Sequence, residues 1–288
     1  MFLLIACLFI NSWIGVIFKY FHKYSVDNFQ AITVNYFVCL LTGSVVSGEF
    51  ALPRDIFDKS WFWLAVLLGF LFVLTFNLMA LTVRHFGVGI ATIFQKMSLV
   101  APAILAMVWY GESTSITRIA GIILALGSIF LLNQKKSGHE GQTHSKWEML
   151  LPMTIFIGSC VVDTSLFLVE KEKLAPNGDI QFVSSLFFFA GVFGLLKLIY
   201  DGTRGKVRYS HNNILGGIAL GIPNFFSIYL LLMLLAKGWD GSFVFPVNNV
   251  GVLLLAAIFG FFLFNEKWNN KRLAGFFLAI SAIILISL

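Results

Sequence analysis

The hydrophobic residues of this chain occur in long uninterrupted runs, separated by short polar breaks. An α-helix rises about 1.5 Å per residue, so a run of about 20 apolar residues spans the ~30 Å hydrocarbon core of a bilayer. The pattern therefore predicts an all-α polytopic membrane protein with ten transmembrane helices. The predicted helices cover residues 2–18, 29–48, 60–82, 87–110, 116–133, 149–169, 180–199, 213–236, 242–264 and 271–288.

Composition agrees with this prediction. Of the 288 residues, 58% are hydrophobic and 12% are charged, and the mean hydropathy is +0.87. A soluble domain of this size needs more charge to cover its surface, and no polar segment is long enough to fold alone. The net charge of +6 comes from Lys and Arg residues near the predicted helix ends. This placement is typical of membrane topology signals and argues against nucleic-acid binding.

The Lys and Arg residues also predict the orientation of the chain. Of the 20 such residues, 13 lie after odd-numbered predicted helices, 6 lie after even-numbered ones, and Lys96 lies within a helix. Because positive charge accumulates on the cytoplasmic side, the odd-numbered connections are expected to be cytoplasmic. We therefore expect a multi-pass protein of the cell (inner) membrane with both termini outside.

Two stretches share one sequence pattern at a constant offset. Residues 87–133 and residues 241–288 each contain an apolar run, a short polar break and a second apolar run. Common apolar residues match by chance, but less common residues that hold one register over about forty positions indicate an internal duplication. The matched pairs include Gly87 with Gly241, Glu112 with Glu266, Arg118 with Arg272, Ala120 with Ala274, and Gly121 with Gly275.

The number of predicted crossings between the two copies determines their relative orientation in the membrane. The second copy begins five predicted crossings after the first, and an odd number of crossings inverts it relative to the membrane. Inverted repeats that share a central site are an architecture of secondary transporters. We therefore predict a 5+5 inverted repeat, with residues 1–133 as the first repeat, 134–146 as a polar linker and 147–288 as the second repeat.

Two charged residues fall inside predicted helices. Lys96 lies about two turns into helix 87–110, and Asp163 lies well inside helix 149–169. A charge at such a depth costs about 2.5–3.5 kcal/mol on insertion scales, which makes a functional role the first hypothesis. Lys96 is the candidate binding group for a substrate carboxylate or phosphate, and Asp163 is the candidate proton-coupling group. The alternatives are a structural ion pair, or a Lys96 that extends to the membrane interface.

Polar and aromatic side chains within the predicted helices extend this candidate substrate site. The amides either line the site or form hydrogen bonds between helices, which are worth only about 0.6–2 kcal/mol each. The aromatic residues are candidates for stacking on a ring or an organic cation. The amide set is Asn11, Asn35, Asn77, Gln95, Asn224, Asn248 and Asn249, and the aromatic set is Trp13, Tyr36 and Tyr229.

The duplicated Glu112 and Glu266 permit two interpretations. They are either a pair of gates, one at each membrane face, or the starts of the next helices. In the second interpretation each Glu lies near the positive end of its own following helix, with Arg118 or Lys271 as a surface partner. The sequence favours the second interpretation.

The remaining chemistry of the chain is sparse. Cys7, Cys39 and Cys160 lie in apolar runs without metal-ligand spacing, and the histidines lie in loops or at helix ends. His139 and His144 lie in the polar linker without an accompanying ligand set, so no metal and no cofactor is expected. The helices contain neither paired carboxylates nor an HExxH motif, so no catalytic residue is predicted and the chain is not expected to be an enzyme.

Together, the ten short helices, the duplication, and the Gly-Glu break before a helix that opens with Arg-x-x-Gly resemble the EamA-like family of the drug/metabolite transporter superfamily. The resemblance covers the whole chain and is most specific around Glu112 and Glu266. It implies a bundle in which both halves surround a central cavity, alternating access, and traffic of small molecules. Many relatives have the opposite charge bias, with termini inside, so the direction of transport stays open.

The resulting prediction is a secondary active transporter of a small polar or amphipathic metabolite, such as an amino acid, an organic ion or a drug-like molecule. It works by alternating access and is proton-coupled or an exchanger. Its expected partners are the small-molecule substrate, the lipid bilayer and protons, and the protein is a monomer or a homodimer. The alternatives are a membrane-embedded enzyme and a non-transporting scaffold or sensor subunit.

Overall fold

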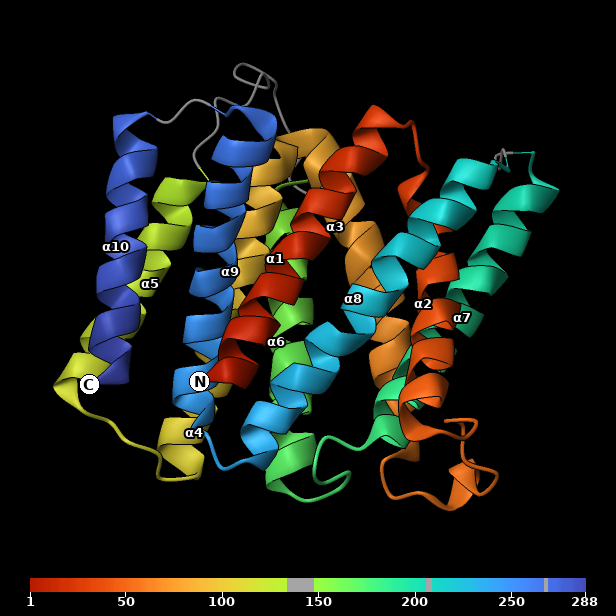
Figure 1. Ribbon diagram of the computed structural model, residues 1–288, viewed down its shortest axis with the longest axis horizontal. Helices are drawn as coiled ribbons and strands as arrows, with labels where there is room; N and C mark the ends of the chain where they lie inside the picture. The colour runs from red at the N-terminus through yellow and green to blue at the C-terminus, as the bar shows by residue number, and fades with distance from the viewer. Residues whose placement is uncertain (134–147, 206–208, 267–268) are drawn as a thin grey trace. The chain divides into compact units, whose positions relative to one another are not determined.

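The computed structural model describes residues 1–133, 148–205, 209–266 and 269–288 (Figure 1). All regular elements within these ranges are helical, and every predicted helix overlaps an observed one. The predicted linker 134–146, with His139 and His144, lies outside the described residues. The elements are α1 (Phe2–Lys23), α2 (Asn28–Ser47), η1 (Ile56–Asp58), α3 (Phe62–Lys96), η2 (Met97–Leu99), α4 (Val100–Trp109), α5 (Ile116–Leu132), η3 (Glu148–Leu150), α6 (Leu151–Lys171), α7 (Ile180–Thr203), α8 (His211–Ala236), α9 (Gly241–Phe264) and α10 (Asn270–Ser287).

Helices that can cross a membrane dominate the described part of the chain. Eight helical stretches are long and apolar enough for this, and the shorter apolar helix Ile116–Leu132 accompanies them. One of the eight, Phe62–Trp109, contains 48 residues. At about 1.5 Å per residue it is roughly 72 Å long, more than twice the thickness of a hydrocarbon core. The chain is therefore a multi-pass membrane protein, and this stretch is too long for a single straight crossing.

A single glycine divides that long stretch. Gly87, inside α3, has φ 83° and ψ 163°, which is not helical. Side chains with a Cβ essentially never adopt this conformation, whereas glycine adopts it at little steric cost. The break predicted between residues 82 and 87 thus occurs at Gly87, in a stretch without a polar loop.

Polar caps start several of the other helices. The Asp27 carboxylate accepts a hydrogen bond from the Gln30 amide at 2.9 Å and starts α2. The Asp179 carboxylate accepts from the Gln181 amide at 2.8 Å and starts α7. Both residues satisfy amides that have no partner inside the helix, as N-cap residues do. Asp27 and Asp179 therefore mark the starts of α2 and α7.

The described residues belong to two compact units. The first unit comprises Met1–Val73 and Leu168–Lys237, with α1, α2, α7, α8 and one part each of α3 and α6. The second unit comprises Leu74–Phe167 and Gly238–Leu288, with α4, α5, α9, α10 and the remaining parts of α3 and α6. Each unit combines segments from both halves of the sequence. The predicted repeats, residues 1–133 and 147–288, are defined by similarity of sequence and not by contacts in space. The repeats stay a prediction.

Small residues bring helices together in the first unit. A Cβ added to Gly217 of α8 would lie 2.5 Å from the Val34 Cβ of α2. A Cβ on Gly221 would lie 2.5 Å from the Val38 Cβ one turn further along α2. The two glycines form a small-xxx-small motif that lets the helix backbones approach closely.

In the second unit, α5 packs against α10 through matching glycines. A Cβ on Gly121 of α5 would lie 2.9 Å from the backbone nitrogen of Ile286. A Cβ on Gly275 of α10 would lie 3.0 Å from the backbone nitrogen of Leu132. Gly121 and Gly275, and likewise Leu132 and Ile286, are separated by the same 154 residues that separate Glu112 from Glu266. The contacts are therefore reciprocal.

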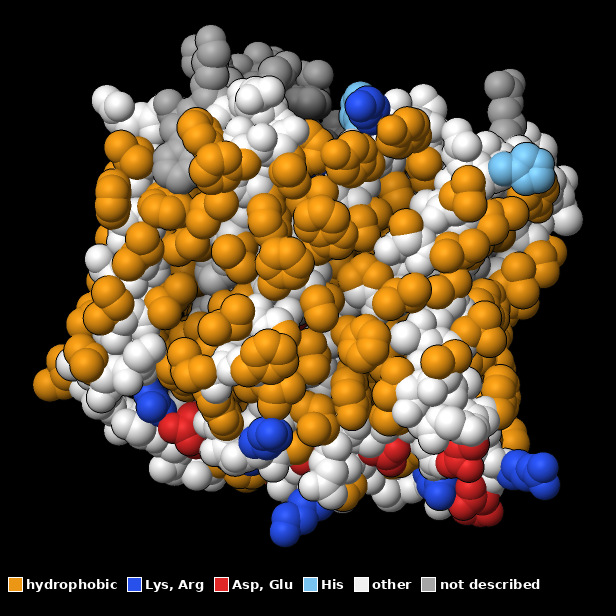
Figure 2. All heavy atoms as spheres, in the orientation of Figure 1, with side chains coloured by type: hydrophobic (Ala, Val, Ile, Leu, Met, Phe, Trp, Pro, Cys, Tyr) orange, Lys and Arg blue, Asp and Glu red, His pale blue; other side chains and the backbone are white. Residues whose placement is uncertain are grey.

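The outer surfaces of the helices are apolar. Hydrophobic side chains cover the helices in the face shown in Figure 2, and the Lys, Arg, Asp and Glu side chains gather near helix ends. Large exposed hydrophobic residues include Leu215 and Ile222 of α8 and Phe277 and Ile284 of α10. Such a surface suits contact with lipid acyl chains.

Candidate functional site

The candidate site in the second unit is built on an interrupted helix. α3 ends at Lys96, the tight turn η2 follows, and α4 continues from Val100. Pro102 has no backbone N–H, so it cannot donate to the carbonyl of Ser98 four residues earlier. The Cys160 thiol of α6 lies 4.0 Å from that carbonyl oxygen. The interruption thus exposes polar backbone beside Lys96, and such backbone is tolerated at membrane depth where it is buried in protein or lines a cavity.

Lys96 is held by an amide. Its Nζ donates a hydrogen bond to Asn249 Oδ1 of α9 at 3.1 Å. Asn249 itself is 7% exposed, whereas Lys96 is half-buried. A hydrogen bond to a charged group is stronger than one between neutral groups. Asn249 therefore holds the Lys96 ammonium group against α9.

Asp163 is held by a hydroxyl group. Ser98 Oγ, in η2, donates to Asp163 Oδ2 of α6 at 2.5 Å, and Asp163 is half-buried. In the described residues, neither a salt bridge nor a hydrogen bond joins Asp163 to Lys96. Each charge is therefore hydrogen-bonded to a neutral partner, and the direct ion pair considered as the structural alternative is not formed in the described residues, although the two charges interact electrostatically. This arrangement leaves an ammonium and a carboxylate able to act on a third group.

The remaining amides predicted in this region lie on helices of the second unit. Gln95 precedes Lys96 in the last turn of α3, and Asn77 lies further towards the start of α3. Both are half-buried, and Asn248 of α9, beside Asn249, is 8% exposed. In the register of the duplication Gln95 matches Asn249.

Two predicted amides meet in the first unit. Asn224 Nδ2 of α8 donates to Asn35 Oδ1 of α2 at 3.2 Å. Asn35 Nδ2 donates to the Ile32 carbonyl at 3.3 Å, and the Cys39 thiol donates to Asn35 Oδ1 at 3.5 Å. Asn35 is 1% exposed. The pair thus bonds one helix to another, which is the structural alternative considered for these amides.

The other candidates of the first unit lie within helices. Asn11 donates to the Cys7 carbonyl of its own helix at 3.0 Å. Tyr36 is buried and stacks on Phe187, and Tyr229 stacks on Phe225. Trp13 is 39% exposed and stacks on Phe9. Whether these residues bind a substrate stays a prediction.

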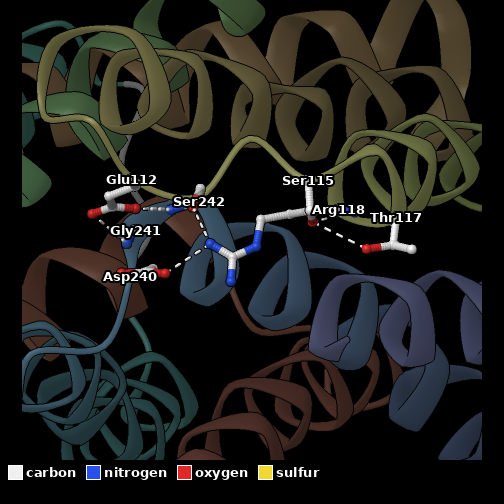
Figure 3. A network of polar contacts seen from close by, with 7 residues as sticks. All are labelled: Glu112, Ser115, Thr117, Arg118, Asp240, Gly241 and Ser242. Carbon is white, nitrogen blue, oxygen red and sulfur yellow. Dashed lines mark hydrogen bonds and ion pairs between the residues drawn. The ribbon is translucent and has the colours of Figure 1, made fainter.

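The expectation that Glu112 starts its own following helix is wrong. Ser115 caps α5 by accepting from the Arg118 amide at 3.2 Å. Glu112 instead accepts hydrogen bonds from the Gly241 amide at 3.1 Å and the Ser242 amide at 2.9 Å, the first amides of α9 (Figure 3). The reason is the left-handed turn at Gly111, φ 64°, which lets the Glu112 amide donate back to Ala106.

The partner expected for each duplicated residue also differs. Arg118 is not a surface residue: its side chain is 14% exposed and pairs with Asp240 at 2.7 Å. Glu266 pairs with Arg272 at 2.7 Å, and not with Lys271 as expected. Asn269 provides the cap of α10 by accepting from the Arg272 amide at 2.8 Å.

Sequence reasoning missed three polar residues that organise these sites. Ser98 was available as a signal, because it lies two residues after Lys96. Asp240 and Ser242 are the neighbours of Gly241, the first matched residue of the second copy. That match was the signal in the sequence that could have identified them. Their partners lie far away in sequence, and no local pattern pairs them.

Comparisons with known proteins agree with the fold. The model of the EamA-like transporter family matches residues 1–134. An uncharacterised protein of Haemophilus influenzae is 27% identical over 292 residues, which cover 98% of this chain and 96% of that protein. A solved crystal structure superposes with a TM-score of 0.77 at 11% identity, covering 99% of this chain and 94% of the other. The last likeness shows a shared fold over nearly the whole chain.

Proposed function

We propose that the chain is a secondary active transporter, because the model of the EamA-like transporter family, which belongs to the drug/metabolite transporter superfamily, matches residues 1–134. Its substrate is a small polar or amphipathic metabolite, such as an amino acid, an organic ion or a drug-like molecule. It moves this substrate by alternating access, coupled to protons or by exchange. The protein acts in the cell (inner) membrane, as a monomer or a homodimer.

Ten crossings follow from dividing the longest apolar stretch at Gly87. Phe62–Trp109 then supplies two crossings, and the seven other long stretches supply one each. Ile116–Leu132 has 17 residues and is about 26 Å long, close to the ~30 Å core, so it supplies the tenth.

Several matched backbone features support a 5+5 inverted repeat. At the offset of 154 residues the chain repeats a left-handed residue, the backbone bond of the following Glu, and the cap of the next helix. These pairs are Gly111 with Asn265, the bond from Glu112 to Ala106 with the bond from Glu266 to Gly260, and Ser115 with Asn269. Such agreement is expected of two copies of one ancestral segment.

One observation carries the proposal: Lys96 and Asp163 lie in membrane helices of one unit, and each is held by a neutral group. A scaffold gains little from two costly charges that do not pair. In our proposal Lys96 binds a substrate carboxylate or phosphate, and Asn249 positions its ammonium group. Asp163 exchanges a proton, and Ser98 holds its carboxylate. When substrate and proton favour different states of the carrier, their movements become coupled.

Transport by the purified full-length protein in liposomes tests the proposal. A panel of radiolabelled probes comprises amino acids, a sugar, a nucleotide and a quaternary amine, each offered with and without a pH gradient. A thermal-shift screen with the unlabelled compounds selects the order of testing. We expect saturable uptake of at least one anionic or zwitterionic member, and loss of that uptake in Lys96→Ala.

A matched control is available on α7. Lys197 forms an i,i+4 ion pair with Asp201 near the end of that helix. Lys197→Ala removes a positive charge of the same type, but outside the candidate site, and uptake is expected to continue. Equal loss in the two variants would contradict a role for Lys96 in binding. An inserted protein that transports no member of the panel would favour a scaffold or sensor subunit instead.

Orientation is tested separately. A periplasm-only reporter fused after Leu288 is expected to be active, because the Lys and Arg distribution puts both termini outside. An inactive reporter on an inserted protein would reverse the proposed sidedness.

A further inference from the structure

At one end of the second unit, residues after α4 hold the start of α9 (Figure 3). The Glu112 carboxylate accepts from the Gly241 and Ser242 amides, and Arg118 Nη1 donates to Asp240 at 2.7 Å and to the Ser242 hydroxyl at 3.0 Å. We call these five residues the α9 clasp. Glu112 is 8% exposed and Ser242 is fully buried, whereas the Asp240 side chain is 38% exposed, so the bonds of Glu112 are shielded from water and the clasp reaches solvent at Asp240.

The clasp takes the place of an ordinary helix cap. Asp240 is the N-cap residue of α9, but its side chain makes no capping hydrogen bond. The carboxylate that satisfies the first amides comes instead from Glu112, 129 residues away. A negative charge at this position is also favoured by the positive end of the helix dipole. The start of α9 is therefore held by a contact that can be released without unwinding α5, whose own cap is Ser115.

The second copy contains the same Glu and Arg, but not the side chains that Arg118 binds. Glu266 and Arg272 pair with each other, and their side chains are 17% and 18% exposed. The residues that match Asp240, Gly241 and Ser242 are Phe86, Gly87 and Val88. Phe86 and Val88 offer no side-chain acceptor to Arg272, which explains why Arg272 pairs with Glu266. The Gly87 and Val88 amides remain the equivalents of the amides that Glu112 binds.

The two arrangements lie at opposite ends of one helix. The α9 clasp is at Gly241, and Glu266 follows Phe264, the last residue of α9. The 24 residues of α9 correspond to about 36 Å, enough to cross the hydrocarbon core. One Glu–Arg couple therefore lies near each end of α9: Glu112 and Arg118 bond to the start of α9, whereas Glu266, after its last residue, pairs with Arg272 of α10.

We propose that the two couples are alternating gates of the transport cycle, and this inference rests on the proposed function. In the present state Glu112 and Arg118 close the α9 clasp. In the opposite state Glu112 releases α9, and Glu266 accepts hydrogen bonds from the Gly87 and Val88 amides. Arg272 lacks the acceptors that Arg118 has, so the second closure is weaker than the first. The asymmetry of the partners thus sets which state predominates without substrate.

Distances between paired spin labels on the full-length protein test this proposal. Cys7, Cys39 and Cys160 are first replaced by Ala. Labels at Thr114 and Trp239, replaced by Cys, report on the α9 clasp, and labels at Arg84 and Asn270 report on the other end. In Glu112→Gln, one hydrogen-bond acceptor and the charge are lost. We expect the Thr114–Trp239 label distance to lengthen and the Arg84–Asn270 label distance to shorten.

A second variant strengthens the opposite closure. Phe86→Asp with Val88→Ser gives Arg272 the acceptors that Asp240 and Ser242 give Arg118. Hydrogen bonds to charged groups change the ratio of two conformational states by about tenfold or more. The ratio of the state in which Glu266 binds the Gly87 and Val88 amides to the state in which the α9 clasp is closed should therefore rise by about that factor. The matched control is Phe86→Asn with Val88→Ser, which has the same shape without the charge and should shift the ratio less.

The outcomes separate a gate from a fixed structural contact. Opposite changes at the two ends, in either variant, support alternating gates. A change confined to the mutated end, or no change in the Asp/Ser variant, overturns them. If Glu112→Gln fails to fold, the Asp/Ser variant alone decides. Uptake in liposomes is measured in parallel: transport without opposite distance changes overturns the gates and leaves the transporter proposal standing.

Discussion

The two units of the molecule treat their intramembrane polar groups differently. In the first unit, the neutral amides of Asn35 and Asn224 bond to each other between α2 and α8. In the second unit, the charged Lys96 and Asp163 do not bond to each other in the described residues, and each has a neutral partner. The first arrangement joins two helices, whereas the second keeps two charges separate.

The energies involved explain what this difference teaches. An amide hydrogen bond between membrane helices contributes about 0.6–2 kcal/mol, which is an ordinary packing contribution. Each intramembrane charge costs about 2.5–3.5 kcal/mol, and direct pairing would recover part of that cost. Because the two charges are bonded to neutral partners and not directly to each other in the described residues, the second unit is the better candidate for substrate binding, and the bond between the first unit's amides is a packing contact.

The largest effect is expected from Asp163→Asn. The variant keeps a group that can bond to Ser98 but cannot exchange a proton. We expect the stimulation of uptake by a pH gradient to disappear, while binding of the selected probe, measured by thermal shift, persists. A variant that still responds to the gradient would show that coupling does not use Asp163.

Lys96→Ala should reduce transport somewhat less. Loss of a charge-assisted hydrogen bond to substrate is expected to lower the initial uptake rate by about 10- to 100-fold. The decrease should appear as weaker binding of anionic and zwitterionic probes. A cationic probe whose uptake falls equally would contradict a role for Lys96 in binding a carboxylate or phosphate.

Smaller effects are expected from the partners that position the charges. Asn249→Ala and Ser98→Ala each remove one neutral partner and should lower uptake by about three- to tenfold. The charge itself remains, so saturating substrate should recover part of the rate for Asn249→Ala. An unchanged rate in both variants would show that the charges need no positioning.

The smallest effect on transport should follow from changing the first unit. Asn35→Leu combined with Asn224→Leu removes both amides together, so neither is left buried without its partner. We expect a change in stability of at most about 1–2 kcal/mol and uptake within twofold of the unmodified protein. Thermal unfolding in detergent gives the first quantity and liposome uptake the second. A large loss of uptake with normal stability would assign these amides to the substrate site after all.

Hydropathy predicted most of the fold because membrane helices must satisfy their own backbone hydrogen bonds. Each predicted helix overlaps an observed helix, and the predicted break between helices 60–82 and 87–110 is found at Gly87, just after the polar Arg84 and His85. Lys96 and Asp163 were found for a related reason, since a charge in such a run stands out by its cost.

Partners were harder to predict than helices. Asn249 lies 153 residues from Lys96, and Asp163 lies 65 residues from Ser98. Which residues meet depends on how the helices pack, and packing is not visible in a local pattern. Glu112 illustrates this, because the local rule assigned it to the next helix, whereas the turn at Gly111 directs it to α9.

The reciprocal contacts between α5 and α10 have a consequence for how this chain can evolve. Gly121 faces the Ile286 side chain, and Gly275 faces the Leu131 side chain, so each of the two helices supplies a small residue that accommodates a large one of the other helix. A larger residue at either glycine would therefore clash with the other helix. Homologous sequences should therefore covary between positions 121 and 286 and between positions 275 and 131.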